Sequence, residues 1–484
     1  MVSCACSQRK HAPHGCQQGA TMSLTLPWTA PRPLSTDQTD FLDDVFAPVP
    51  SETETTALRV VGELPAALNG VYARIGPNPL KPNPKRYHWF IGDGMVHGLR
   101  LKEGRAEWYR SRYVGSNTAH KALGRPLLPG PRHGVGDVVN TNVYAHAGRV
   151  WASVEAGMLP VQLDARLESV RHGTFDSPNK QPFTAHPHRD PHTGELHAIC
   201  YDALKRNKVQ YVRVSPQGEL SRVVDIPVQH GPMIHDCAIS RRFVVVLDLP
   251  VTFSFKRLLS FSAFPYAWND RHPARVGLLP KDGQASDIRW HDVDPCFVFH
   301  PCNAFDLPDG SVVMDVVAHR RMFDRSRQGP EMDSGARFER WTMPADGGRV
   351  VREVLHEQPQ EFPRLDERLV GEPYRYAYAV GFGDGRQGGL PLLRHDLQAR
   401  QTLRHDLGAH AVPGEFVFVP RQAQGAEDDG WLVGLVHNRQ SGRAEFHVIN
   451  ADDFTGPPQA VVHIPARIPA GFHGNWIADA DLHP

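Results

Sequence analysis

The feature that most constrains the fold is a series of short extended segments, separated by turns, that runs from about residue 57 to the C-terminus. In 96–114, two runs of alternating or β-branched residues flank Glu103 and Gly104. Short glycine-containing connections between such runs are the sequence signal of a β-hairpin. The pattern recurs in 142–157, 209–227, 340–357 and 430–454. Hairpins without βαβ alternation predict a single all-β domain.

The length of 484 residues is compatible with a large β-propeller. Seven blades would take about 69 residues each, more than the about 40–45 of compact repeats, so long inserted loops would have to absorb the difference. The sequence has no visible repeat, and a pair of β-sandwiches also fits the hairpin pattern. Helical periodicity is weak throughout, and the best helix candidate is the short segment 253–264.

Composition and charge narrow the possible functions. Lys plus Arg and Asp plus Glu each number 53, so the chain lacks the basic excess typical of a nucleic-acid-binding protein. Its 7 cysteines have no repeated spacing, which indicates reduced thiols in a reducing compartment. No apolar run reaches the about 18–20 residues of a membrane span. Residues 1–21 contain no continuous apolar stretch, so we expect no secretory signal there. We therefore expect a cytoplasmic protein that binds no nucleic acid.

Polarity along the chain predicts its organisation. Residues 1–21 are polar and are expected to form a disordered extension. Residues 22–56 would form an N-terminal arm, and 57–484 the single folded domain.

The richest histidine segment contains His186, His188, His192 and His197. It begins like the His-x-His-x-Asp-His signature of binuclear zinc hydrolases, but Pro191 intervenes before His192 and breaks the ligand spacing. Turn-forming residues dominate this stretch. A solvated turn is therefore the expectation for His188, His192 and His197.

Three further histidines, His235, His300 and His473, stand in apolar surroundings. Taken singly, each would be read as a hydrogen-bonded core histidine. Together with His186, they fall on four different candidate blades. Imidazoles that converge from separate strands can form a metal centre on a rigid β-scaffold, and nitrogen ligands suit a first-row ion such as iron.

Glu155, Glu361 and Glu415 lie in apolar, strand-like contexts. A carboxylate there is costly unless it is paired. A metal-ligating imidazole needs its second nitrogen fixed, often by a carboxylate, so these glutamates are candidate partners of the histidines. The alternative for each is a surface position on an edge strand.

At these residues the sequence resembles the carotenoid cleavage oxygenase family, from about residue 58 to the C-terminus. The resemblance rests on an ordered set of motifs: NGVYARIGPNP, YHWFIGDGMVHGLRL, NTNV, TAHPHRDPHTGELH, MIHDCAIS, FHPCNAFD, EFPRLDERLVG, EFVFVPR followed by EDDGWLVG, and GFHGNW. One such motif would be weak, but the ordered set is specific.

The resemblance implies a seven-bladed β-propeller over 57–484, with a cap of loops and short helices over one axial non-haem Fe(II). Its four ligands match His186, His235, His300 and His473, and the carboxylates behind them match Glu155, Glu361 and Glu415. Thr141 matches a position beside the iron. Two departures stand out: Asp306 replaces a common glutamate, and Val154 stands where tryptophan is frequent, which would alter the cavity.

The implied activity is cleavage of a conjugated C=C bond of a carotenoid or apocarotenoid by O2, which gives two carbonyl products of the apocarotenal or retinal type. Four neutral imidazoles leave the ferrous charge uncompensated, so no 2-oxoglutarate is expected, nor haem or NAD. An apolar tunnel would select the double bond. Its candidate wall residues are Thr141, Val154, Phe299, Phe305 and Trp268.

Other functions remain open on the sequence alone. A stilbene-cleaving dioxygenase of the same family would use the same iron ligands, and so would a polyene isomerase or a polyene-binding protein. A zinc hydrolase and a metal-free scaffold are further alternatives. The insertion 251–268 combines phenylalanine and leucine with Lys256 and Arg257, which suits peripheral membrane contact, although an internal lid is equally compatible.

Overall fold

The computed structural model describes Met1 and residues 41–131, 137–177, 181–260, 262, 264–332, 334–382 and 389–482. The fold below belongs to the compact unit of residues 39–484. The predicted extension 1–21, apart from Met1, and residues 22–40 of the predicted arm lie outside the described residues. The boundaries between extension, arm and domain therefore stay predictions.

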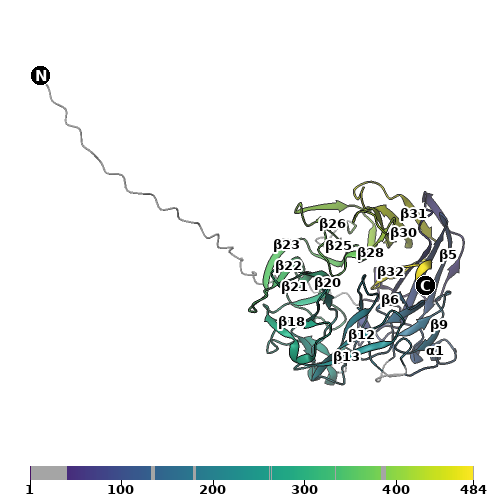
Figure 1. Ribbon diagram of the computed structural model, residues 1–484. Coiled ribbons are helices and arrows are strands. Elements are labelled where there is room, and N and C mark those ends of the chain that lie inside the picture. The colour runs from purple at the N-terminus through teal and green to yellow at the C-terminus, as the bar shows by residue number, and fades with distance from the viewer. Residues whose placement is uncertain are drawn as a thin grey trace. The chain divides into compact units, whose positions relative to one another are not determined.

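Seven antiparallel sheets of four or five strands follow one another around a ring, which confirms the predicted seven-bladed β-propeller and excludes a pair of sandwiches (Figure 1). Blade one contains β32 (Gly474–Ala478), β3 (Gly70–Pro77), β4 (Gly94–Lys102), β5 (Arg105–Tyr113) and β1 (Glu54–Thr55). Blade two contains β6 (Asn142–His146), β7 (Arg149–Ser153), β8 (Val161–Leu163) and β9 (Ser169–His172). Blade three contains β10 (His188–Arg189), β11 (Leu196–Cys200), β12 (Lys208–Val214) and β13 (Leu220–Pro227).

Blade four contains β14 (Ala238–Ile239), β15 (Phe243–Asp248), β18 (Arg275–Pro280) and β19 (Arg289–Asp292). Blade five contains β20 (Phe297–Asp306), β21 (Val312–His319), β22 (Arg337–Met343) and β23 (Val351–His356). Blade six contains β24 (Gln360–Arg364), β25 (Tyr376–Gly381), β26 (Leu392–Asp396) and β27 (Gln401–His405). Blade seven contains β28 (Ala411–Pro420), β29 (Gly430–Asn438), β30 (Arg443–Asn450), β31 (Ala460–Ile464) and β2 (Arg59–Gly62).

The predicted hairpins are confirmed, and their turns explain why these sequences reverse. Glu103 and Gly104 join β4 to β5 with φ angles of 47° and 74°. Ala147 and Gly148 join β6 to β7 with φ angles of 51° and 71°. Two consecutive left-handed residues match the right-handed twist of the flanking strands, and glycine in the second position tolerates that conformation without strain.

The two ends of the described chain close the ring. The C-terminal β32 pairs with β3, where Trp476 lies opposite Tyr72. The early strand β2 pairs with β31 of the last blade, where Val60 lies opposite Val462. Blades one and seven therefore each combine segments from opposite ends of the chain. This closure holds the inner strands in fixed positions around the axis.

The strands near the propeller axis are more deeply buried than the outer strands. Every residue of β3 and of β21 is buried, including the charged side chains Arg74 and Asp315. The outer strand β13 alternates between buried and exposed side chains over most of its length. Large fully buried rings such as Trp151 and Trp341 lie in the layers between blades. The described cysteines, Cys200, Cys237, Cys296 and Cys302, are buried and free.

Short helices lie in the connections between the strands, before β1 and after β32. They are α1 (Asn117–Ala122), α2 (Phe255–Leu259), α3 (Asp479–Leu482), η1 (Asp44–Phe46), η2 (Trp89–Ile91), η3 (Ala285–Asp287) and η4 (Glu367–Leu369). Among the described residues, the helix predicted within 253–264 is confined to α2, Phe255–Leu259. It lies between β16 (Val251–Phe253) and β17 (Tyr266–Trp268), which pair with each other as an insertion between β15 and β18. None of the helices in the described part of the chain has the length and apolar character of a membrane span.

Candidate metal centre and cavity

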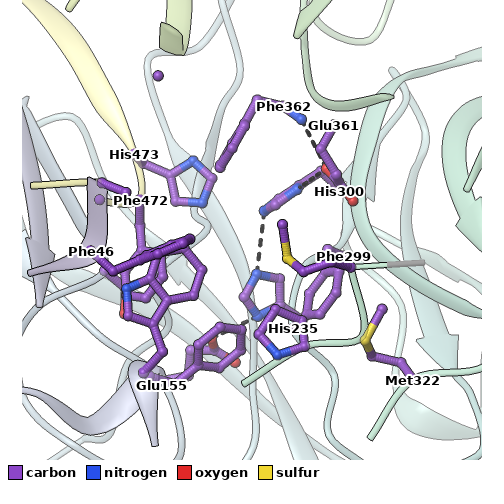
Figure 2. A pocket seen from close by; sticks show the side chains of 18 of the residues that line it. Phe46, Glu155, His235, Phe299, His300, Met322, Glu361, Phe362, Phe472 and His473 are labelled. Atoms are coloured by element: carbon purple, nitrogen blue, oxygen red, sulfur yellow. Dashed lines mark hydrogen bonds and ion pairs between the residues drawn. The ribbon is translucent and has the colours of Figure 1, made fainter. Parts of the chain in front are cut away.

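Four histidines meet where the inner strands of blades one, three, four and five begin. His186 precedes β10, His235 precedes β14, His300 lies within β20 and His473 immediately precedes β32. One ring nitrogen of each lies within 4.8 Å of the others, and all four side chains are buried. The structure thus brings together the four residues that the motifs singled out, as Figure 2 illustrates for His235, His300 and His473.

The nitrogens that meet here suit a cation. Nε2 of His235 lies 3.3 Å from Nε2 of His300. Because the Nδ1 atoms of both rings face carboxylates, which only accept hydrogen bonds, each Nε2 of a neutral ring presents a lone pair. Nε2 of His186 is also buried and has no hydrogen-bond partner. Lone pairs this close repel one another unless a metal ion or a proton lies between them, so the residues present fit a nitrogen-ligated metal.

Three of the histidines are backed by the predicted glutamates, each from another blade. Nδ1 of His235 lies 2.7 Å from Oε1 of Glu155, and Nδ1 of His300 lies 2.7 Å from Oε2 of Glu361. Nδ1 of His473 lies 3.2 Å from Oε1 of Glu415. Such contacts fix the tautomer and leave Nε2 free to face the centre.

The surroundings keep two of these carboxyl groups ionised. Burial alone would raise the pKa of Glu361, but the charges and hydrogen bonds of His300 and His319 outweigh it and lower that pKa. Burial opposes ionisation of Glu415 as well. The charges of His473 and Arg364, with hydrogen bonds to that carboxylate, still lower its pKa to about 2.

A further set of side chains, which sequence reasoning missed, orients the glutamates. The Tyr201 hydroxyl donates to Oε2 of Glu155 at 2.7 Å. Nε2 of His319 lies 2.5 Å from Oε1 of Glu361, and Nδ1 of His319 lies 2.6 Å from the Ser334 hydroxyl. Arg364 Nη1 lies 3.4 Å from Oε1 of Glu415. These partners lie 46, 42 and 51 positions along the chain from the glutamates that they contact. Arg364 falls within one of the motifs, but the sequence offered no signal for which glutamate each partner meets.

His186 differs from the other three ligand candidates. In the described part of the chain, the nearest carboxylate oxygen to its ring is Oδ2 of Asp236, at 3.9 Å from Nδ1. Asp236 instead binds Nε2 of His188 at 2.8 Å and accepts the Cys237 amide at 2.6 Å. Burial, followed by the neighbouring histidines, lowers the pKa of His186 well below its usual value, so the ring is neutral at neutral pH.

His188, Asp236 and Cys237 form a second group whose candidate ligand atoms lie within 4.8 Å of one another. Its cysteine is a poor metal ligand. Burial and the charge of Asp236 raise the pKa of the Cys237 thiol well above its usual value, and the thiolate is the form that binds metals. We therefore regard the four-histidine cluster as the candidate centre.

The histidine and the aspartate that a binuclear zinc site would need bind other partners in the structure. Nε2 of His192 lies 3.0 Å from Glu372, and Asp190 pairs with Lys281 at 2.6 Å. The expected solvated turn is wrong for His197, which is fully buried on β11 with Nδ1 2.9 Å from the Tyr211 hydroxyl. Every residue of β11 is buried, so none of its side chains forms a solvated turn.

A cavity of about 1050 Å³ opens beside the cluster. Among the predicted wall residues, Thr141, Val154 and Phe299 line it, together with His235, His300 and His473. Much of the remaining wall is aromatic and comes from loops, short helices and the strands β17 and β24: Phe46, Trp89, Phe90, Phe264, Tyr266, Phe362 and Phe472. Several of these rings surround the imidazoles in Figure 2. Phe90 lies in one of the motifs, but only the folded chain reveals that the loops converge.

Phe305 and Trp268, also predicted as wall residues, are not among the described residues that line this cavity. Phe305 lies on the same strand as Phe299, but six residues further along a strand is about 20 Å away. It packs between blades five and six. Trp268 ends β17, where its ring stacks under Arg321 at 4.5 Å and its indole N–H donates to Asp270.

Phe362 marks local strain at the centre. Its φ angle is 55°, in the left-handed region that a bulky residue rarely adopts. The pairing of β24 with β25 shifts register between Glu361 and Arg364, and the Phe362 amide donates to Oε2 of Glu361 at 2.8 Å. The ring centroid of Phe362 lies 5.6 Å from those of His300 and His473. This irregularity directs Glu361 toward His300 and the phenyl ring into the cavity.

Fold and site together define a β-propeller whose axis carries a candidate four-histidine metal centre beside an apolar cavity. Residues 46–478 match the family described as retinal pigment epithelial membrane protein (RPE65). The chain therefore belongs to the RPE65/carotenoid oxygenase family, as its motifs predicted. The Mycobacterium tuberculosis carotenoid cleavage oxygenase is 40% identical and covers 91% of this chain and 97% of its own length. The Phaseolus vulgaris carotenoid 9,10(9',10')-cleavage dioxygenase 1 is 30% identical, covering 91% of this chain and 90% of its own length.

Solved structures agree with this assignment. The Pseudomonas brassicacearum lignostilbene dioxygenase superposes with a TM-score of 0.81 at 27% identity, over 92% of this chain and all of that chain. A variant of the Synechocystis apocarotenoid oxygenase superposes with a TM-score of 0.78 at 25% identity, over 89% of this chain and 97% of that chain.

Proposed function

We propose that this protein is an Fe(II)-dependent dioxygenase that cleaves a conjugated C=C bond of a carotenoid or apocarotenoid with O2 and releases two carbonyl products. The observation that carries the proposal is a buried cluster of four imidazoles beside a large apolar cavity, which three of them line. The carotenoid cleavage named for the Mycobacterium tuberculosis and Phaseolus vulgaris relatives supports the same reaction class.

His186, His235, His300 and His473 would hold one iron per chain. When bound, Fe(II) supplies the activation of O2, which does not react readily with an alkene by itself. The chain's own residues then have two tasks. Glu155, Glu361 and Glu415 fix the rings, while the aromatic wall excludes water from the reacting bond. No side chain need act as a nucleophile or a general acid.

The cavity favours an extended apolar substrate. Its volume of about 1050 Å³ is at the upper end of the about 300–1,000 Å³ usual for ligand sites. Phe90, Phe299 and Phe472 present ring faces or edges to it, and polyenes pack well against such surfaces. Val154, on the wall close to Glu155, leaves more room than the tryptophan often found there in the family.

Stilbene cleavage is the second candidate, favoured by the superposition on the lignostilbene dioxygenase. The cavity offers phenolic groups for such a substrate, since Tyr201 and Tyr266 both line it. However, the Tyr201 hydroxyl is already committed to Glu155, and both tyrosines are buried. We therefore place carotenoid and apocarotenoid substrates first.

We further propose that the protein is cytoplasmic and contacts membranes peripherally through the insertion 251–268. On α2, Phe255, Leu258 and Leu259 are 57%, 48% and 77% exposed, and Lys256 and Arg257 lie between them. Exposed apolar side chains beside basic residues suit shallow insertion into a bilayer. The following residues Phe264 and Tyr266 turn inward and line the cavity. The insertion would thus connect the bilayer with the cavity and also act partly as a lid.

Liposome flotation tests the membrane contact. The wild type is expected to float with vesicles, and the F255S/L259S variant to remain with the soluble fraction. The V351S variant is a matched control, because Val351 is 60% exposed on the outer strand of blade five. Equal flotation of all three proteins would contradict the membrane contact and favour the lid.

Product analysis tests the enzymatic function. Fe(II)-loaded protein is given an apocarotenal, a full-length carotenoid and a hydroxylated stilbene under air, and aldehydes are identified by chromatography and mass. We expect aldehydes from at least one polyene. Cleavage of the stilbene alone would support the second candidate. With iron bound and no aldehyde from any of the three, the function would be that of an isomerase or a polyene-binding protein.

A further inference from the structure

One part of the apolar cavity wall carries two buried polar groups that the proposed reaction does not use. Arg74, on β3, is 4% exposed, and its Nε atom has no hydrogen-bond partner. Its Nη2 donates to the carbonyl oxygen of Pro469. His437, near the end of β29, has a buried Nδ1 without a partner. Both residues line the same cavity as three of the four clustered histidines.

Two glycines make room for the guanidinium. A Cβ atom on Gly414 would lie 2.6 Å from Nη1 of Arg74, and one on Gly471 would lie 3.3 Å from its Nε. Any larger residue at Gly414 would displace the Arg74 side chain. The guanidinium is thus held at the cavity wall by backbone on both sides rather than by a carboxylate.

The local charge balance is positive. Burial is the main cause that lowers the pKa of His437. The positive charges of Arg467, Arg439 and Arg74 lower it further. Among the described carboxylates, Asp44 acts on His437, and it pairs with Arg439 at 2.9 Å. Glu415, a carboxylate that acts on Arg74, is engaged by His473, the Gly474 amide and Arg364. An anion from outside would therefore meet uncompensated donors.

We propose that Arg74 and His437 form a subsite for the carboxylate end of a polyene substrate. This inference rests on the proposed function and names its preferred substrate class as polyene acids. A guanidinium only donates hydrogen bonds, and a buried donor without a partner is costly, so an acceptor that reaches Nε gains the full value of the contact. Carboxylates bind guanidinium strongly through charge-assisted bonds. Docking one end of the chain there would also fix which double bond lies beside the histidine cluster.

The competing role for Arg74 is that of a clamp, since its bond to Pro469 holds the loop that leads to Phe472 and His473. If Arg74 is a clamp, replacing it should weaken the binding of every ligand alike. If it belongs to a carboxylate subsite, replacing it should weaken only ligands that carry a carboxylate. Replacing His437 should then weaken the same ligands, although His437 makes no bond to the loop among the described contacts.

Equilibrium binding without turnover separates the two roles. Retinoic acid and methyl retinoate are titrated into the metal-free full-length protein, and quenching of tryptophan fluorescence gives each Kd. We expect the wild type to bind the acid about tenfold or more tightly than the ester. The R74Q variant should lose this preference and H437F should reduce it, while R421Q, which removes an exposed arginine of blade seven, should keep it.

Equal Kd values for acid and ester in the wild type, or no binding of either, would overturn the subsite. So would an R74Q variant that weakens both ligands alike while H437F changes neither, because that pattern belongs to a clamp. Cleavage is not measured in this titration. Loss of the proposed function, as absence of aldehyde from iron-loaded protein under air, is therefore a separate result.

Discussion

Two sides of the histidine cluster are built differently. His235, His300 and His473 each place Nδ1 within 3.2 Å or less of a glutamate oxygen. His186 has no carboxylate oxygen nearer than the 3.9 Å of Asp236 in the described residues. Three rings therefore each contact a carboxylate, whereas the fourth is held by its backbone and by packing. The comparison teaches that metal affinity here should depend on the three glutamates far more than on Asp236.

The two sides of the cluster also differ in the side chains that contact their carboxylates. Each glutamate has its own further partner: a tyrosine for Glu155, a histidine for Glu361 and an arginine for Glu415. Buried carboxylates are costly without such partners, so these groups help to keep the glutamates in place against the imidazoles. Asp236 instead forms hydrogen bonds with His188 and with a backbone amide. It stabilises the loop after His235 rather than the His186 ring.

The largest effect is expected from removing a ligand candidate. The H300A variant should bind iron more than about a hundredfold more weakly than the wild type, since even outer partners of a metal site cost about 10–100-fold. Metal titration under anaerobic conditions measures this. H192A is the matched control, because His192 is exposed and pairs only with Glu372 among its described contacts. Full iron content in H300A would remove this histidine from the centre.

Breaking a glutamate contact should come next. The E361Q variant keeps the shape of the side chain but loses its charge, so iron affinity should fall about 10–100-fold. E353Q, on the outer strand of blade five, is the control for losing one carboxylate. Unchanged affinity in E361Q would show that the carboxylates do not support the rings.

The outer partners should matter less. The H319L and Y201F variants each remove one hydrogen bond to a glutamate, which corresponds to a loss of about two- to tenfold in iron affinity. H319Q, which keeps an amide donor, tests whether a donor alone rescues part of the loss. If H319L weakened iron binding more than E361Q did, His319 would have to act on the centre directly and not through Glu361.

The smallest effect is expected at Asp236. Because no hydrogen bond joins it to His186, D236N should change iron affinity by less than about twofold. Thermal denaturation of the same variant should detect the lost contact with His188. A loss in iron affinity as large as that of E361Q would erase the contrast between the two sides of the cluster.

The sequence was sufficient for much of the fold and for the identity of the cluster. Turn pairs such as Glu103–Gly104 act locally, and the inner-strand histidines sit in ordered motifs. Three kinds of feature needed the folded chain. Which glutamate meets which histidine depends on the order of blades around the ring. Tyr201 and His319 reach their glutamates across blades. Phe305 looked equivalent to Phe299, but the length of β20 carries it away from the cavity.

The most direct test of the account is the metal content of the purified protein, measured by mass spectrometry for the wild type and for two variants after iron loading and desalting. The account predicts one iron per chain in the wild type, none retained in H235A, and one retained in C237S. Iron retained in H235A but lost in C237S would assign the metal to the group of His188, Asp236 and Cys237, and would contradict the four-histidine centre.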